Sequence, residues 1–407
     1  MMRVALVTTF FGPHRFGGDA AYVERLAEAL LRRGHHVEVF YSRDAFEALR
    51  GSRESLAYEA PSGLVVHALS NPFPRLSLLW AHQTGGSGPG ASELNRRLQT
   101  GGFDVVHYHN VSLVGGAGLL GLRIPGAIRL MTAHEHWLTC PLSVLWRFDR
   151  ESCTKPSCAR CTVRAGRPPQ FWRSTGRLRR ALGNLDALVF PSLHSRDAHR
   201  ERGISHPNSH VLPYFLPDAW TQAEPPPAPA ADAPFLFVGR LVREKGLETI
   251  LPLFRSRSDC RLDVLGDGPY RKDLERLAAG ARNIRFLGGC SADGVRAHLA
   301  HARALLVPSR FPETFGYVIL EAWAHAVPVF VGRAGALPEV VGPGGGAVCD
   351  TAQDFAKAID GSLAQPGEAR RTGLSGWNRA RAEFTESGHL SAWEKIVRSA
   401  KPPRHDA

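Results

Sequence analysis

Short apolar runs alternate with helical stretches at the start of the chain. Residues 3–10 form a β-branched apolar run with the length of a strand covered on both faces. After a loop rich in Gly and Pro, apolar residues in 21–33 recur at helical spacing, and residues 35–41 have the pattern of a second strand. This order predicts a βαβ unit, and therefore a parallel sheet with a right-handed crossover.

The same alternation continues and then restarts, which predicts two domains. Further strand-like runs cover 64–69, 103–109, 127–134, 187–192 and 210–214, and after a Pro- and Ala-rich stretch, 235–240, 260–268, 283–289, 304–309 and 327–332. Residues 223–234 are too rich in proline for helix or sheet. We expect an α/β fold with two Rossmann-like, doubly wound parallel-sheet domains. The predicted parts are an N-terminal domain (1–215), a linker (216–234), a C-terminal domain (235–383) and a helical segment (384–407) that returns to the first domain.

The composition excludes several protein classes. The chain has 407 residues, of which 43% are apolar and 22% charged, so it is not a disordered, collagen-like or small disulfide-stabilised protein. No apolar run approaches the roughly 18 residues of a membrane span. The opening residues resemble a signal peptide only weakly, and the seven cysteines are an odd number. We expect a cytoplasmic protein.

Positive charge is the main departure from an average composition. The net charge is +12, with 50 Lys and Arg against 38 Asp and Glu. An anionic ligand would explain the excess, and so would arginines spread over solvated faces. Residues 163–180 concentrate arginines around Phe171 and Trp172. This stretch fits a solvated helix face, an anionic membrane surface, an acidic acceptor or a nucleic acid.

Candidate ligand-binding residues follow the strands of the second domain. Arg240 and Lys245 come directly after the strand at 235–238 and can converge on one pair of phosphates, although surface charge alone would look the same. Further on, Glu313 and Glu321 flank Gly316, where a helix is expected to begin. A helix N-terminus stabilises negative charge, which suits an anionic leaving group. A ligand is expected in a cleft between the two domains, at the carboxyl ends of the strands.

These motifs resemble the retaining glycosyltransferases of family 4. The segments VGR…EKG, LGDGP and PSRFPETFGYVILEA occur in the family's order and spacing, and the Gly-Gly loop and the segments DVVHYHN and LMTAHEHW resemble its N-terminal half. The resemblance implies the GT-B architecture, in which two Rossmann-like domains face each other across a cleft. It also implies transfer of a sugar from a nucleotide-diphosphate donor with retention of configuration.

The resemblance also implies roles for individual residues. Arg240 and Lys245 would clamp the diphosphate, Glu313 would contact the donor sugar, and Glu321 the ribose. His134 would bond the donor sugar near the reacting carbon, or be an ordinary buried histidine, and His109 and His136 are weaker acceptor-side candidates. Residues expected to contact the donor in other ways are Gly17, Gly18, Gly239, Gly266, Ser309, Phe315 and Gly316. The chain contains no Asp-x-Asp motif, so the chemistry is expected to need no metal ion or other cofactor.

A cysteine-rich insertion at about 137–165 departs from the family pattern. Its thiols are Cys140, Cys153, Cys158 and Cys161. Four thiolates suit a structural zinc ion or an iron–sulfur cluster, but the first spacing fits no zinc-finger pattern well, and free or redox-active thiols are the alternative. The other three, Cys260, Cys290 and Cys349, are expected in the core.

Three function classes remain open at this level. The first is a glycosyltransferase acting on a small metabolite, lipid or polysaccharide acceptor, with or without peripheral membrane contact. The second is a nucleotide-sugar epimerase or phosphorylase of the same architecture. The third, a metal-knuckle nucleic-acid-binding protein, leaves the motif of the second domain unexplained.

Overall fold

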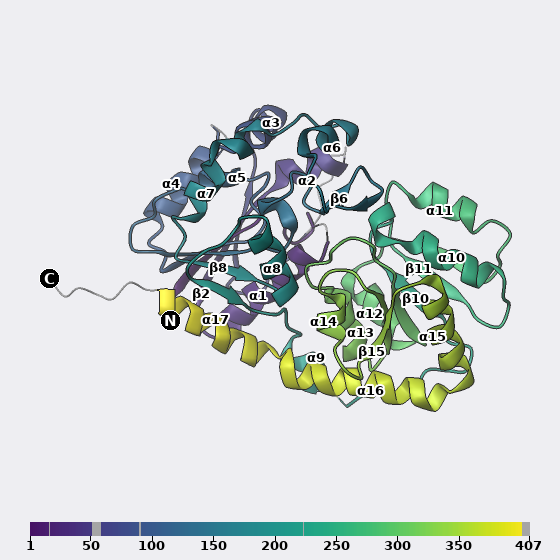
Figure 1. The fold of residues 1–407 in the computed structure, drawn as a ribbon. Coiled ribbons are helices and arrows are strands. Elements are labelled where there is room, and N and C mark those ends of the chain that lie inside the picture. Colours follow the sequence, from purple (N-terminus) through teal and green to yellow (C-terminus); the bar gives the residue numbers. More distant parts are fainter. Residues whose placement is uncertain (16, 51–57, 89–90, 223, 401–407) are drawn as a thin grey trace. The chain divides into compact units, whose positions relative to one another are not determined.

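The computed structural model describes residues 1–15, 17–50, 58–88, 91–222 and 224–400, which form two compact units (Figure 1). Unit 1 contains Met1–Ser143, Ser157–Pro213 and the chain from His389 onward, and unit 2 contains Val144–Pro156 and Tyr214–Gly388. Phe16 of the glycine-rich loop, Ala223 of the expected linker and residues 401–407 lie outside the described residues.

Unit 1 is built on a seven-stranded parallel sheet in the order β3-β2-β1-β4-β5-β8-β9. Its strands are β1 (Arg3–Val7), β2 (His36–Ser42), β3 (Val65–Leu69), β4 (Val105–Tyr108), β5 (Ile128–Thr132), β8 (Ala187–Phe190) and β9 (Ser209–Val211). Its helices are α1 (Gly17–Arg32), α2 (Arg43–Arg50), α3 (Pro74–Thr84), α4 (Ser92–Thr100), α5 (Gly116–Leu120), η2 (His136–Leu138), α6 (Cys158–Arg164), η3 (Phe171–Thr175), α7 (Arg177–Leu182), α8 (Leu193–Glu201) and most of α17 (Glu386–Ala400).

Unit 2 has a six-stranded parallel sheet in the order β12-β11-β10-β13-β14-β15. Its strands are β10 (Phe235–Val238), β11 (Leu262–Leu265), β12 (Ile284–Gly288), β13 (Ala304–Val307), β14 (Val329–Gly332) and β15 (Gly346–Cys349), with a separate hairpin of β6 (Trp146–Arg147) and β7 (Glu151–Ser152). Its helices are α9 (Asp218–Gln222), η4 (Arg243–Lys245), α10 (Leu247–Arg255), α11 (Arg271–Leu277), α12 (Ala292–Ala300), α13 (Tyr317–Ala324), α14 (Leu337–Val341), α15 (Ala352–Ala364) and α16 (Pro366–Glu383).

Both sheets confirm the predicted doubly wound α/β fold. In each, the first strand lies in the middle and the chain runs first to one side and then to the other, so the order reverses at β1/β4 and at β10/β13. Ligands of such sheets bind at the carboxyl ends of the strands near this reversal. The strands of these sheets are apolar along most of their length because both faces of each sheet are covered.

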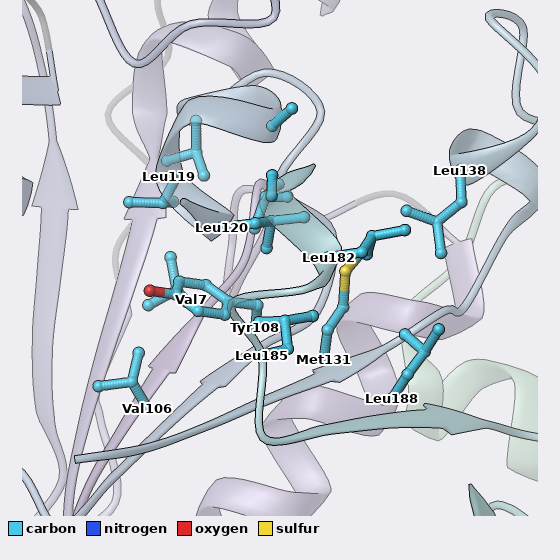
Figure 2. Close-up of a cluster of buried hydrophobic side chains, with 14 of the residues drawn as sticks. Val7, Val106, Tyr108, Leu119, Leu120, Met131, Leu138, Leu182, Leu185 and Leu188 are labelled. Atoms are coloured by element: carbon cyan, nitrogen blue, oxygen red, sulfur yellow. The ribbon is translucent and has the colours of Figure 1, made fainter. Parts of the chain in front are cut away.

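Each unit has a core of its own. In unit 1, Val7, Tyr108 and Met131 from the sheet pack with Leu120 and Leu182 from the helices on one face (Figure 2). In unit 2, aliphatic and aromatic residues of the central strands pack against α10 and α15. The strand ends that carry the candidate site residues therefore project from well-packed layers.

The domain boundaries differ from the predicted ones at two points. The hairpin at Val144–Pro156 belongs to unit 2, although it is inserted in the sequence of the first domain. The predicted linker begins with ordered structure, because α9 is helical and Leu216 pairs with Thr385. A sequence pattern locates an insertion in the chain, but the surface on which it packs depends on tertiary contacts.

None of the described helices is long and apolar enough to cross a membrane.

Candidate functional site

The first part of the candidate site is the loop after β10 in unit 2. Gly239 and the exposed Arg240 follow the strand directly, and the short helix η4 ends with Lys245. Burial raises the pKa of the neighbouring carboxyl group of Glu244, while the charges of Arg240 and Lys245 act in the opposite direction. The two cations predicted from the sequence thus lie in one short loop at a strand end.

Lys245 is bound to Glu313 in this site. Its Nζ atom donates a hydrogen bond of 2.7 Å to Oε1 of Glu313, and the hydroxyl of Ser309 donates one of the same length to the same oxygen. Ser309 and Glu313 are buried, and Lys245 also lies over the ring of Phe311 at 5.0 Å. The structure therefore brings three predicted site residues together, and two donors fix the orientation of one carboxylate.

Helix α13 begins close to Glu313 in the chain, as predicted. Gly316 is its N-cap residue, with φ of 95°, and a Cβ there would lie 2.6 Å from Leu337. The Phe315 side chain is buried against Tyr214 and Phe384, so only its backbone is available to a ligand. Glu321 lies in the second turn of α13 and is partly exposed, unlike the buried residues on either side of it.

Two glycines are required by close backbone contacts. A Cβ on Gly266 would lie 1.8 Å from the carbonyl oxygen of Gly239, and one on Gly246 would lie 2.1 Å from that of Pro308. Gly266 has φ of 142° and Gly246 has φ of 68°. These contacts hold the loops after β10, β11 and β13 together. They explain why glycine occupies both positions, whether or not a ligand binds there.

The β6–β7 hairpin packs on the same region of unit 2. Asp149 forms an ion pair of 3.3 Å with Arg243, and Trp146 lies under the guanidinium of Arg310 at 5.3 Å. The non-glycine residues Leu145, Phe148 and Asp149 all have positive φ, and such strain is maintained only where surrounding contacts hold it. Sequence analysis missed Arg243, Arg310 and this hairpin, because no local pattern joins an insertion to a distant loop.

In unit 1, the predicted histidines lie at adjacent strand ends. His109 follows β4 and His134 follows β5, and their ring nitrogens Nδ1 and Nε2 are 2.9 Å apart. Both are buried. Burial lowers the pKa of His134 to about 3, and burial together with the neighbouring histidines lowers that of His109 well below its usual value. Both rings are therefore neutral at pH 7 and can bind a polar group but cannot supply a positive charge.

A further set of buried polar contacts surrounds this pair. Tyr22 of α1 lies against the rings of His109 and His134, and its hydroxyl is 3.0 Å from Nε2 of His389 in α17. Nδ1 of His389 donates to the carbonyl of Pro213 at 2.8 Å, so Nε2 accepts from Tyr22. His389 was not predicted as a site residue, because its position in an amphipathic helix is that of an ordinary core residue.

The remaining unit 1 candidates are placed as follows. Gly17 and Gly18 form the first turn of α1, so the helix begins earlier than the expected 21–33. His136 lies in η2, is buried and stacks on His199 at 5.2 Å. It thus packs in a different set of rings from the His109–His134 pair.

The cysteines of the insertion are divided between the two units. Cys140, Cys158 and Cys161 belong to unit 1 and Cys153 to unit 2. Across the described part of the chain, no group of three or more His, Cys, Asp or Glu side chains is arranged to hold a metal ion. The four-cysteine metal site predicted from the sequence stays a prediction. The expectation that the other three thiols are core residues is wrong for Cys290, which is exposed.

Two family models match consecutive parts of the chain. The model described as Glycosyltransferase Family 4 matches residues 16–217, and the one described as Glycosyl transferases group 1 matches residues 218–376. The MMP α-(1→4)-mannosyltransferase of Mycolicibacterium hassiacum is 29% identical over 94% of this chain and 95% of its own length. Several other relatives match only in part, and the chain spans 20% of the length of one and 45% of another.

Solved glycosyltransferase structures have the same fold. Sucrose-phosphate synthase from Thermosynechococcus elongatus gives a TM-score of 0.75 at 21% identity, covering 98% of this chain and 99% of that one. HepE from Anabaena, solved in complex with UDP-glucose, gives 0.70 at 15% identity, covering 98% of this chain and 100% of that one. At these identities the likeness establishes the fold alone, which is GT-B.

Proposed function

The chain belongs to the group 1, family 4-like glycosyltransferases, and from this we propose that it transfers a sugar from a nucleotide-diphosphate donor with retention of configuration. The observation that carries the proposal is the cluster of Lys245, Glu313 and Ser309 beside the N-terminus of α13. The complex of HepE with UDP-glucose supports the donor class.

In the proposed reaction, charge separates as the bond between sugar and phosphate breaks. Positive charge builds on the anomeric carbon and negative charge on the departing diphosphate. Arg240, Lys245 and the backbone N–H groups at the start of α13 stabilise the diphosphate, and such preorganised groups are usually the largest single contribution to catalysis. Glu313, held by Lys245 and Ser309, faces the donor sugar, and Glu321 accepts hydrogen bonds from the ribose.

Retention requires the acceptor to attack from the face that the diphosphate leaves. The departing phosphate oxygen then takes the proton of the acceptor hydroxyl, so no side chain has to act as a nucleophile. The neutral His134 donates or accepts a hydrogen bond at the sugar without adding positive charge near the reacting carbon. No step uses a metal ion, since Arg240 and Lys245 supply the positive charge for the leaving group.

The proposed compartment is the cytoplasm. The sequence has seven cysteines, an odd number that does not resemble the disulfide framework of a secreted protein.

The test is a thermal-shift screen with UDP-, GDP- and dTDP-sugars, followed by mass spectrometry and proton NMR of the products. We expect stabilisation by one donor family, a product with the donor's anomeric configuration, and unchanged activity in excess EDTA. Inversion at the anomeric carbon would contradict the mechanism. An epimerised sugar from donor alone would show an epimerase, and sugar phosphate formed with inorganic phosphate as acceptor would show a phosphorylase.

A further inference from the structure

One helix of unit 1 exposes apolar side chains on its outer face. On and just before α3, Phe73, Leu76, Leu79 and Trp80 are 68%, 66%, 50% and 51% exposed. On the opposite face, Leu78 packs against the cluster that contains Phe46 of α2. Exposed apolar residues that gather on one face mark an interaction surface.

Neighbouring elements hold α3 in this orientation. Nε1 of the buried Trp172 in η3 donates a hydrogen bond of 2.9 Å to the carbonyl of His82, and Nη1 of Arg177 donates one of 3.1 Å to that of Thr84. Both carbonyls belong to the last turn of α3, where backbone acceptors are free. These two hydrogen bonds hold α3 in place with its apolar face turned outward.

The segment that holds α3 is strongly basic. Residues 152–185 contain eight Lys and Arg and no Asp or Glu, and residues 72–88 also lack acidic residues. Arg160, Arg164 and Arg167 are exposed, and the charge of Arg167 acts on His82 of α3. Two exposed apolar residues lie among these arginines, namely Val163 (62%) and Phe171 (72%).

We propose that this surface docks on an anionic lipid bilayer. We name it the α3/α6 surface (labelled α3 and α6 in Figure 1) and define it by apolar residues Phe73, Leu76, Leu79, Trp80, Val163 and Phe171 and basic residues Arg75, Arg160, Arg164 and Arg167. Its apolar side chains enter the interface between headgroups and acyl chains, and the arginines contact lipid phosphates. Docking is independent of the proposed transfer chemistry, which uses other residues.

The apolar part of the surface favours a bilayer over a nucleic acid. Nucleic-acid-binding surfaces combine cations with aromatic rings on which bases stack. Leu76 and Leu79 offer neither a ring nor a hydrogen bond, and their exposure has no role in binding phosphates alone. A bilayer uses both the leucines and the arginines, which makes it the occupant that accounts for the whole surface.

The test is cosedimentation of the full chain with vesicles of phosphatidylcholine alone or with 30% phosphatidylglycerol. We expect binding to the anionic vesicles that weakens steeply between 50 and 500 mM NaCl, and little binding to the zwitterionic ones. A 30-mer of single-stranded RNA and one of DNA serve as competitors in the same assay. No binding to anionic vesicles at 50 mM NaCl overturns the proposal, and so does tighter binding to either oligonucleotide than to the vesicles.

Two triple variants separate the apolar and the electrostatic contributions. Phe73→Ser/Leu76→Ser/Phe171→Ser should lower partitioning at least tenfold, because these side chains enter the interface. Arg160→Gln/Arg164→Gln/Arg167→Gln should lower it on the order of 100-fold, at about fivefold for each charge. Within the described residues these arginine side chains form no hydrogen bond or ion pair, so folding should be preserved. Trp80 is left unchanged because it packs against the backbone at Gly88.

Two control variants change exposed residues elsewhere in the chain. Leu193→Ser/Leu277→Ser/Leu287→Ser removes side chains that are 48%, 43% and 41% exposed, and Arg255→Gln/Arg282→Gln/Arg371→Gln removes three exposed charges of unit 2. Both controls should bind vesicles within twofold of the unchanged chain. Equal losses in the control and test variants would mean that net charge or general hydrophobicity acts rather than this surface. Nucleotide thermal shifts should be the same in all variants, so a failure of the proposed function would be seen separately.

Discussion

Nζ of Lys245 and Oε1 of Glu313 lie 2.7 Å apart, although the two residues are 68 positions apart in the chain. This ion pair joins the loop after β10 to the segment after β13, the two neighbouring strands at which the order of the sheet reverses. Both side chains are mostly removed from solvent, with 24% and 11% of their surface exposed. The cation proposed for the diphosphate and the carboxylate proposed for the sugar are therefore held together as one ion pair.

We expect Lys245→Ala and Arg240→Ala each to reduce turnover by about 100-fold or more, because each removes one charge that is proposed to stabilise the leaving group. Steady-state kinetics with the donor found by the screen is the measurement. Arg255→Ala, which removes an exposed arginine of the same unit, is the control and should retain activity. Near-normal turnover in both test variants would remove the assignment of these residues to the diphosphate.

Lys245→Ala should also lower stability, whereas Arg240→Ala should not. Lys245 is the cation partner of the buried Glu313, while Arg240 is exposed. Leaving a buried carboxylate without its partner is unfavourable, so adding Glu313→Gln to Lys245→Ala should restore part of the loss. Urea unfolding of Lys245→Ala, of Glu313→Gln and of the variant that carries both changes measures this coupling. Strictly additive effects would show that the pair does not contribute in solution.

The two glutamates should differ in kind. Glu313→Gln should mainly lower kcat, because this group is proposed to face the reacting sugar, and Glu321→Gln should mainly weaken nucleotide binding, because it is proposed to bind the ribose. Ser309→Ala should lower kcat about 10-fold, since it removes one of two hydrogen bonds that orient Glu313. Ser256→Ala, at an exposed position on α10's C-terminal end, is the control. Loss of donor affinity alone in both glutamate variants would show that these roles are wrongly divided.

The buried histidines of unit 1 should make its stability fall in acid. Burial lowers the pKa of His389 from 6.5 to about 4, so between these pH values the unfolded chain binds a proton that the folded chain does not. The free energy of unfolding is therefore highest above pH 6.5 and falls as the pH decreases toward 4. One such histidine accounts for about 1.4 kcal/mol between pH 7.5 and pH 5.5.

His389→Gln should reduce this pH dependence by about that amount. Urea unfolding followed by near-UV circular dichroism at both pH values is the measurement. His301→Gln, at an exposed position, is the matched control and should leave the difference between the two pH values unchanged. An unaltered pH dependence in His389→Gln would show that this histidine is not held neutral in the folded chain.

Gly266→Ala should destabilise unit 2 by roughly 2–4 kcal/mol, because its Cβ would overlap the Gly239 carbonyl and its φ of 142° is unfavourable for alanine. Gly289→Ala, where a Cβ meets nothing within 4 Å, should change stability by less than about 0.5 kcal/mol. Thermal unfolding of both variants compares them directly. Equal stability of the two variants would mean that the backbone contact relaxes without loss.

Local patterns determined much of this protein. The apolar runs and helical periodicity predicted both parallel sheets, because a strand covered on both faces must be apolar throughout its length. The start of α13 at Gly316 was predicted as well, since a helix N-terminus has a local signal. Arg240, Lys245 and Glu313 were chosen as candidates because they follow strands, and Glu321 because it lies near the start of a helix; their roles stay predictions.

Only the tertiary structure decided which distant groups meet. The pairing of Lys245 with Glu313, the packing of Asp149 on Arg243 and the contact of Tyr22 with His389 each join residues from separate elements. The outward apolar face of α3 likewise depends on Trp172, which lies 90 residues from the carbonyl that it binds. A local pattern specifies which face of an element is apolar, but the partner of that face, or its lack of one, follows from how the whole chain packs.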